Sequence, residues 1–166
     1  GPTILNEDAR CLQTTSIEMA DDATVIVGDI FVPNGLTHHE PFSFDHYHSR
    51  TEARVDDGLV CADAVDLRPG ERDPRDPATV GEYAVVGTLY VISPEADADA
   101  LADALADRLA DHAVAGGAST LREGAGVTVR LLGDRSADVT AAMDTAWDET
   151  RQTLLGVGAP LEGRGR

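Results

Sequence analysis

The sequence of 166 residues contains no lysine, and its 13 basic side chains, all arginine, stand against 30 Asp and Glu, so the formal net charge is −17. Proteins bind a phosphate backbone or an anionic lipid surface mainly through lysine and arginine. A chain this acidic repels both kinds of surface. Its composition therefore argues against nucleic acid and membranes as partners.

Cysteine and long apolar runs are scarce as well. Cys11 and Cys61 lie far apart without the CxxC spacing of a redox or zinc site, which predicts buried free thiols. No run approaches the roughly 18–20 apolar residues that span a bilayer, and no basic segment followed by an apolar one opens the chain. These absences predict a cytoplasmic protein.

The acid excess has a physical consequence of its own. At low ionic strength so many like charges oppose the compact state, whereas at molar salt the screening length falls to about 3 Å and the repulsion is largely removed. The charge therefore predicts an organism with a salt-rich cytosol. It also predicts that most of the carboxylates are solvated surface groups without a chemical role.

The length suits one domain, and we expect residues 1–156 to form it, followed by a flexible Gly- and Arg-rich tail over residues 157–166. Polar and apolar residues alternate over the first two thirds of the chain, as in half-buried strands. A tight turn is expected at residues 56–58 and a loop between Asp66 and Gly81. Strands are predicted at residues 14–19, 24–32, 44–55, 59–67 and 83–92.

Two helices are predicted in the last third. Ser93 and Pro94 suit a helix start, and the segment to about residue 114 carries leucines at four-residue spacing. A hairpin is expected over residues 119–132, after which Ser136 caps a helix that ends at Gly156. The predicted fold class is mostly β (α+β): an antiparallel, layered or helical arrangement of strands with two C-terminal α-helices and a small hairpin between them.

The sequence shows no catalytic pattern. It has no GxSxG elbow, and a phosphate-binding P-loop needs the lysine that the chain lacks. The glycines of residues 123–126 join two predicted strands, which is the wrong context for dinucleotide binding. We therefore expect a protein that is not an enzyme, with no catalytic residues and no cofactor-binding residues.

Four of the five histidines fall within residues 38–48. In an extended strand His46 and His48 point to the same face, and His38, His39 or Glu40 could fold over from the preceding loop. Imidazole suits Ni, Cu, Zn or Fe, so the pattern does not name the metal. These five residues are the candidate metal ligands, for transient contact, beside the alternative of a solvated loop and strand face.

A second interpretation uses part of the same cluster. His46, His48 and Glu52 have the core spacing of the first metal motif of cupins, small β-barrels that hold a metal on the barrel wall. The cupin pattern also expects a glycine where this chain has Glu40, and a later histidine, for which His112 on a predicted helix is the remaining candidate. A cupin-like metal-binding barrel enzyme is therefore the alternative function.

Several short motifs, in order over nearly the whole chain, resemble the urease accessory protein family UreD, also called UreH. Their order and spacing carry the resemblance. The matching segments are Pro2-Thr3-Ile4, Gly28-Asp29-Ile30, Glu40-Pro41-Phe42, Gly81-Glu82-Tyr83 with Gly87-Thr88-Leu89, Arg130-Leu131-Leu132-Gly133-Asp134, and Trp147 with Arg151 and Leu154-Leu155-Gly156.

The resemblance implies a non-enzymatic scaffold or chaperone that binds urease apoprotein and, through UreF, recruits the GTPase UreG, so that nickel reaches the urease site. It implies no tightly bound cofactor and transient nickel at most. Because the family is longer before the segment that matches Pro2, it also implies that this chain is the C-terminal part of a longer β-rich domain. Residues 34–35 and the segment 158–161 depart from the family pattern.

Overall fold

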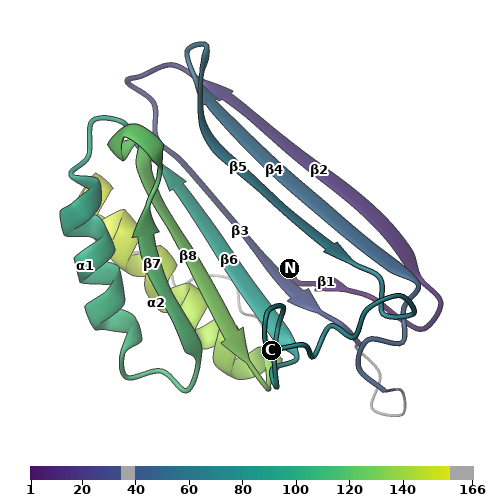
Figure 1. Ribbon diagram of the computed structural model, residues 1–166. Helices are drawn as coiled ribbons and strands as arrows, with labels where there is room; N and C mark the ends of the chain where they lie inside the picture. Colours follow the sequence, from purple (N-terminus) through teal and green to yellow (C-terminus); the bar gives the residue numbers. More distant parts are fainter. Residues whose placement is uncertain (35–39, 158–166) are drawn as a thin grey trace.

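The computed structural model describes residues 1–34 and 40–157, which form two β-sheets and two α-helices (Figure 1). The strands are β1 (Thr3–Ile4), β2 (Arg10–Met19), β3 (Val25–Val32), β4 (His46–Val55), β5 (Gly58–Leu67), β6 (Val85–Ile92), β7 (Ala115–Thr120) and β8 (Gly126–Gly133). The helical segments are α1 (Ala98–Leu109), the short 3-10 turn η1 (Arg122–Gly124) and α2 (Ser136–Leu155).

The chain passes back and forth between the two sheets. One sheet has the order β1-β3-β6-β8-β7 and the other the order β2-β4-β5, so that β2 lies in one sheet and the next strand, β3, in the other. Neighbouring strands separated along the chain by a single strand of the other sheet run in the same direction. The pairs β1–β3 and β2–β4 are accordingly parallel, and the other pairs are antiparallel.

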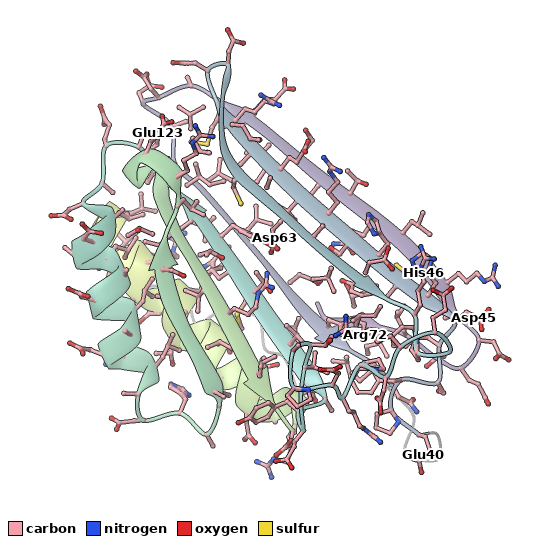
Figure 2. The ribbon with its side chains drawn as sticks, in the orientation of Figure 1. Glu40, Asp45, His46, Asp63, Arg72 and Glu123 are labelled. Carbon is pink, nitrogen blue, oxygen red and sulfur yellow. The ribbon has the colours of Figure 1, made fainter. Side chains whose placement is uncertain are left out.

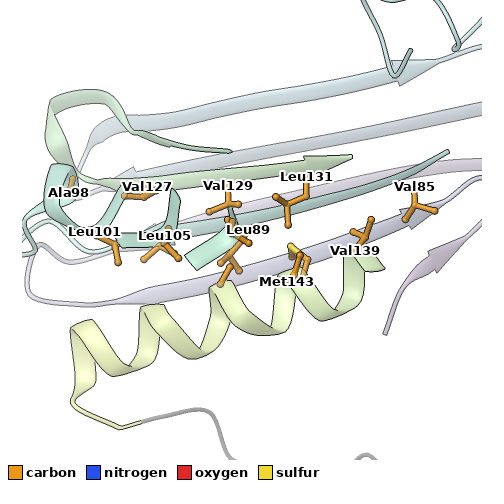
Figure 3. Close-up of a cluster of buried hydrophobic side chains, with 14 of the residues drawn as sticks. Val85, Leu89, Ala98, Leu101, Leu105, Val127, Val129, Leu131, Val139 and Met143 are labelled. Carbon is orange, nitrogen blue, oxygen red and sulfur yellow. The ribbon is translucent and has the colours of Figure 1, made fainter. Parts of the chain in front are cut away.

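Helices α1 and α2 cover one face of the five-stranded sheet (Figure 1), and Figure 3 shows buried side chains between this sheet and α2. Leu89, Val127 and Val129 point to this face and are fully buried, as are Leu101 and Leu105 of α1. Burial of one such side chain contributes about 1.5–3 kcal/mol. The four-residue spacing of the α1 leucines therefore identifies the buried side of that helix correctly.

The opposite face of the five-stranded sheet packs against the three-stranded sheet. An apolar cluster at one end includes Phe31, Phe44 and Tyr47, and a cluster toward the other end includes Ala53 and Ile92. The molecule therefore has three layers, in the order helices, five-stranded sheet and three-stranded sheet (Figure 1). Between the two apolar clusters the inner faces of the sheets carry polar side chains.

The predicted strands are present, but not all of them pair as predicted. All five predicted strands are present, and the first is longer than expected because it begins at Arg10. The prediction of a mostly β chain with two helices is confirmed, whereas a purely antiparallel arrangement is wrong for two of the pairs. The predicted tight turn joins β4 and β5, and Asp56 in this turn has a positive φ of 51°.

The predicted helix ends need correction. The α1 helix begins at Ala98, where the Asp97 carboxylate accepts a hydrogen bond of 3.0 Å from the Ala100 amide, so Ser93 and Pro94 lie in the preceding turn. It ends at Leu109, earlier than expected. Arg135 occupies the N-cap position of α2, which makes Ser136 the first helical residue, whereas Gly156 ends this helix as predicted, with a φ of 66°.

Both cysteines are free, and Cys61 is buried while Cys11 is half-buried. Across residues 1–34 and 40–157, no helix combines the length and apolar composition needed to cross a bilayer. The single domain over residues 1–156 stays a prediction, and all but the first residue of the predicted tail lie outside the described residues.

Candidate metal cluster and cavity between the sheets

Strand β4 brings two of the candidate metal ligands together. Tyr47 lies between His46 and His48 along the strand, and its side chain is buried between the sheets. The two imidazoles therefore lie on the opposite, outer face of the three-stranded sheet. Their ring centroids are 6.4 Å apart. Figure 2 shows His46 at the start of the strand, on the side away from the helices. The same-face placement predicted from the spacing is confirmed.

A third ligand comes from the neighbouring strand. Asp66 of β5 lies opposite His48, and its carboxylate oxygens are 3.1 Å from His46 Nε2 and 3.3 Å from His48 Nδ1. These three residues, here called the His–Asp cluster, offer ligand atoms that all lie within 4.8 Å of one another. In the described part of the chain this is the one group of three or more His, Cys, Asp or Glu side chains that meets that distance.

Arg68 also contacts the cluster. Its Nε donates a hydrogen bond of 3.1 Å to Asp66 Oδ1. Desolvation raises the pKa of Asp66, but the hydrogen bond and charge of Arg68, together with the two imidazoles, outweigh it and lower the pKa below the usual range. Asp66 is therefore held ionised, as a metal ligand must be.

The other predicted ligands do not join this group. His38 and His39 lie outside the described residues, and Glu40 is exposed in the segment ahead of β4. Glu52, required by the cupin interpretation, forms an ion pair with Arg50, and that pair lowers the pKa of Glu52. The cupin set is thus not assembled, and its barrel is replaced by two stacked sheets.

Asp66 is absent from the predicted ligands, and the bulge in the register of β4 and β5 makes it hard to predict from the sequence. Counting outward from the turn, where Val55 faces Gly58, predicts that His48 faces Val65. The pairing shifts by one residue beyond Arg54, which moves Asp66 into that place. A shift of one residue exchanges the two faces of a strand. No turn or composition signal in the sequence marks this bulge.

A cavity of about 400 Å³ lies between the two sheets. At one end Phe31 stacks on Tyr47, with ring centroids 4.3 Å apart. Burial raises the pKa of Tyr47 to about 12, opposed by a hydrogen bond from Ser49 and assisted by the nearby Asp29 carboxylate. Polar residues from both sheets line the cavity, among them Gln13, Thr15, Asp29, Ser49, Thr51 and Thr88.

Asp63, Tyr90 and Arg130 also line this cavity and connect its two walls. The Tyr90 hydroxyl donates a hydrogen bond of 2.5 Å to Asp63, and Arg130 forms an ion pair with the same carboxylate. Burial and this hydrogen bond raise the pKa of Tyr90. Figure 2 shows Asp63 between the sheets. The same three residues line a second hollow of about 450 Å³, so they stand where the two spaces meet.

These side chains can bind ions but are not arranged for nucleophilic chemistry. Over the described ranges, no serine or cysteine is hydrogen-bonded to a histidine, and burial raises the pKa of the Cys61 thiol, which makes it less reactive. His112 lies beyond the end of α1 and is half-buried, away from the His–Asp cluster.

Comparison with known proteins gives the family of this chain. The family model for UreD urease accessory protein matches residues 1–164. Proteins named urease accessory protein UreD are similar to this chain in Haloquadratum walsbyi, at 70% identity over 163 residues, and in Natronomonas pharaonis, at 62% over 165 residues. A third, from Haloarcula marismortui, is 44% identical over 159 residues.

These alignments cover nearly all of this chain but only about half of each relative. The first two include 98% and 99% of the chain, and 54% and 55% of the relative. The third includes 96% of the chain and 53% of the relative. The chain thus spans about half the length of these curated relatives. Both the family match and the identities show that the chain belongs to the UreD family of urease accessory proteins.

Proposed function

We propose that this chain, as part of a protein of the relatives' length, is a non-enzymatic scaffold in urease maturation. In this role it binds urease apoprotein and the partners UreF and UreG, and it supports nickel insertion in the cytoplasm. The observation that carries the proposal is the family match over residues 1–164. The sequence motifs that resemble UreD extend over the same span.

The edge of the three-stranded sheet supports a role in protein binding. Within the described residues β2 pairs with β4 along one side only, so the backbone groups of a ten-residue strand are available along the other. Such an edge can pair with an added strand, whether from another protein or from another part of a longer chain. A scaffold needs surfaces of this kind, and an enzyme has no particular use for them.

Charge and side-chain chemistry support the metal part of the role. The net charge of −17 attracts cations and repels nucleic acid. Carboxylates stand on the cavity wall at Asp29 and Asp63, and the His–Asp cluster presents imidazole as well. Nickel is here the cargo, in transient contact, and no tightly bound cofactor is required.

The proposal is tested with the full-length protein at molar KCl, where the repulsion between acidic partners is screened. We expect it to co-elute with UreF and urease apoprotein in size-exclusion chromatography, and UreG to join when UreF is present. Urease activity should rise with added Ni²⁺ when the full-length protein is included. A mixture lacking only that protein is the control.

Two results would contradict the scaffold role. One is the absence of association with each of the three partners at molar salt. The other is equal nickel-dependent activation with and without the protein. Conversion of a small molecule by the isolated protein would point back to an enzyme.

A further inference from the structure

We propose that His46, His48 and Asp66 form a surface site for one divalent first-row transition-metal ion on the outer face of the three-stranded sheet. The site is built from residues of this chain alone and does not depend on its role in urease maturation. A chain could hold the ion and bind none of the urease partners, or bind them without the ion. The two proposals therefore fail separately.

The distances from the imidazoles to Asp66 are close to those of an ion site. Nitrogen and oxygen ligands of a tetrahedral metal lie about 2.1 Å from the ion and hence about 3.4 Å from one another. The two imidazole nitrogens are 3.1 Å and 3.3 Å from the Asp66 carboxylate. The two contacts involve different oxygens of Asp66, and the three ligand atoms lie within 4.8 Å of one another, so an ion would draw the side chains closer together.

The strands hold the ligands in place. β4, which carries both histidines, is paired on one side with β2 and on the other with β5, which carries Asp66. Ligands on a paired central strand are more accurately positioned than ligands on a loop. The side chains of His46 and His48 are 23% and 31% exposed, so an ion can reach them from solvent. With three protein ligands, a coordination position stays open for water or a partner's side chain.

The ligand set selects the class of metal. Two imidazoles with one carboxylate favour Zn, Ni, Co or Cu, whereas Mg and Ca prefer oxygen ligands alone. The net charge of −17 attracts any cation weakly. Binding measured at molar KCl separates the two effects, because screening removes the general attraction and leaves coordination.

Arg68 competes with the ion. Its guanidinium donates to Asp66 and also lies 3.6 Å from Glu71. A positive charge on a ligand carboxylate repels a divalent cation. Because Arg68 lies just beyond the last residue of β5, it can move aside without disturbing the strand pairing. Removal of its charge should therefore tighten metal binding.

The experiment is calorimetric titration of the metal-free chain with NiCl₂ and with ZnCl₂ at molar KCl. We expect one ion per chain, and a loss of affinity of about tenfold or more in Asp66→Asn and in the double variant His46→Ala with His48→Ala. Arg68→Gln should bind several-fold more tightly. The controls His112→Ala, Asp45→Asn and Arg72→Gln remove the same side chains elsewhere and should bind as the wild type does.

Cu²⁺ electron paramagnetic resonance gives a second measurement. The wild type should show coupling to imidazole nitrogen, and His48→Gln should lose part of it even if the double variant does not fold. Unchanged Ni²⁺ affinity in the folded double variant would overturn the site. Failure of the wild type to bind either ion at molar KCl would do so too, as would equal losses in the cluster variants and their controls.

Discussion

The guanidinium of Arg130 in β8 forms an ion pair with the carboxylate of Asp63 in β5, across the space between the two sheets. The Tyr90 hydroxyl donates to the same carboxylate. One acceptor from the three-stranded sheet therefore serves two donors from the five-stranded sheet. Tyr90 is 8% exposed and borders the cavity between the sheets, where Thr51 is its other hydrogen-bonding neighbour.

Asp63→Ala should lower the free energy of unfolding by about 1–3 kcal/mol, because it leaves a buried hydroxyl without this acceptor. Denaturant unfolding at constant molar KCl measures the change. Asp45→Ala, which removes the exposed partner of Arg10, is the control and should stay within about 0.5 kcal/mol of the wild type. Equal effects of the two substitutions would show that the contact between the sheets contributes no more than a surface ion pair.

Gly87 in β6 allows α2 to pack closely on the five-stranded sheet. A β-carbon at this position would lie 2.8 Å from Val139 Cγ1 and 3.0 Å from Met143 Cγ, both in α2. Gly87→Ala should therefore cost about 1–3 kcal/mol in the free energy of unfolding, since helix and strand must separate. Gly117→Ala in β7 is the matched control, because a β-carbon there meets no atom within 4 Å. If the two variants were equally stable, this packing would be refuted.

The local patterns predicted well those features that depend on neighbouring residues. Alternation located the strands, and the leucine spacing located the buried face of α1. The predicted start of α1 is wrong because Ser93 and Asp97 are both residue types that cap helices well. The deciding factor is packing: Ser93 is buried and bonds through its hydroxyl to Thr24, whereas Asp97 is free to accept from Ala100.

Features that depend on distant residues could not be predicted in this way. The parallel pairing of β2 with β4 follows from the passage of β3 into the other sheet, which no local pattern records. The same holds for the site. Spacing placed His46 and His48 on one face, but their contact with Asp66 depends on a register shift near the turn between β4 and β5.

Tyr47 gives the fold a dependence on alkaline pH. Its pKa is raised to about 12 from an ordinary value near 10, so folding favours the neutral phenol. The resulting stability is fully present below pH 10 and is lost as the pH rises toward 12. Tyr47→Phe keeps the stacking on Phe31 and removes the ionisable group.

Thermal midpoints measured between about pH 9 and pH 11 should thus fall less in Tyr47→Phe than in the wild type. The half-buried Tyr83 supplies the control, since Tyr83→Phe removes a phenol outside the stack. We expect its midpoint to fall with pH as the wild-type midpoint does. If the thermal midpoint of Tyr47→Phe fell with pH as much as that of the wild type, groups other than Tyr47 would cause the alkaline sensitivity.

The net charge of −17 predicts a fold that depends on salt. Lowering KCl from molar to millimolar lengthens the screening distance from about 3 Å to well beyond 10 Å, so repulsion between carboxylates destabilises the compact state. The thermal midpoint should fall across this range.

Asp103 and Asp107 are exposed on α1, and the double variant Asp103→Asn with Asp107→Asn should show a smaller fall because two negative charges are gone. Ala106→Asn places the same amide on that helix without removing charge, and its midpoint should depend on salt as the wild type's does. A wild-type midpoint that is the same in molar and millimolar KCl would contradict this reading of the acid excess.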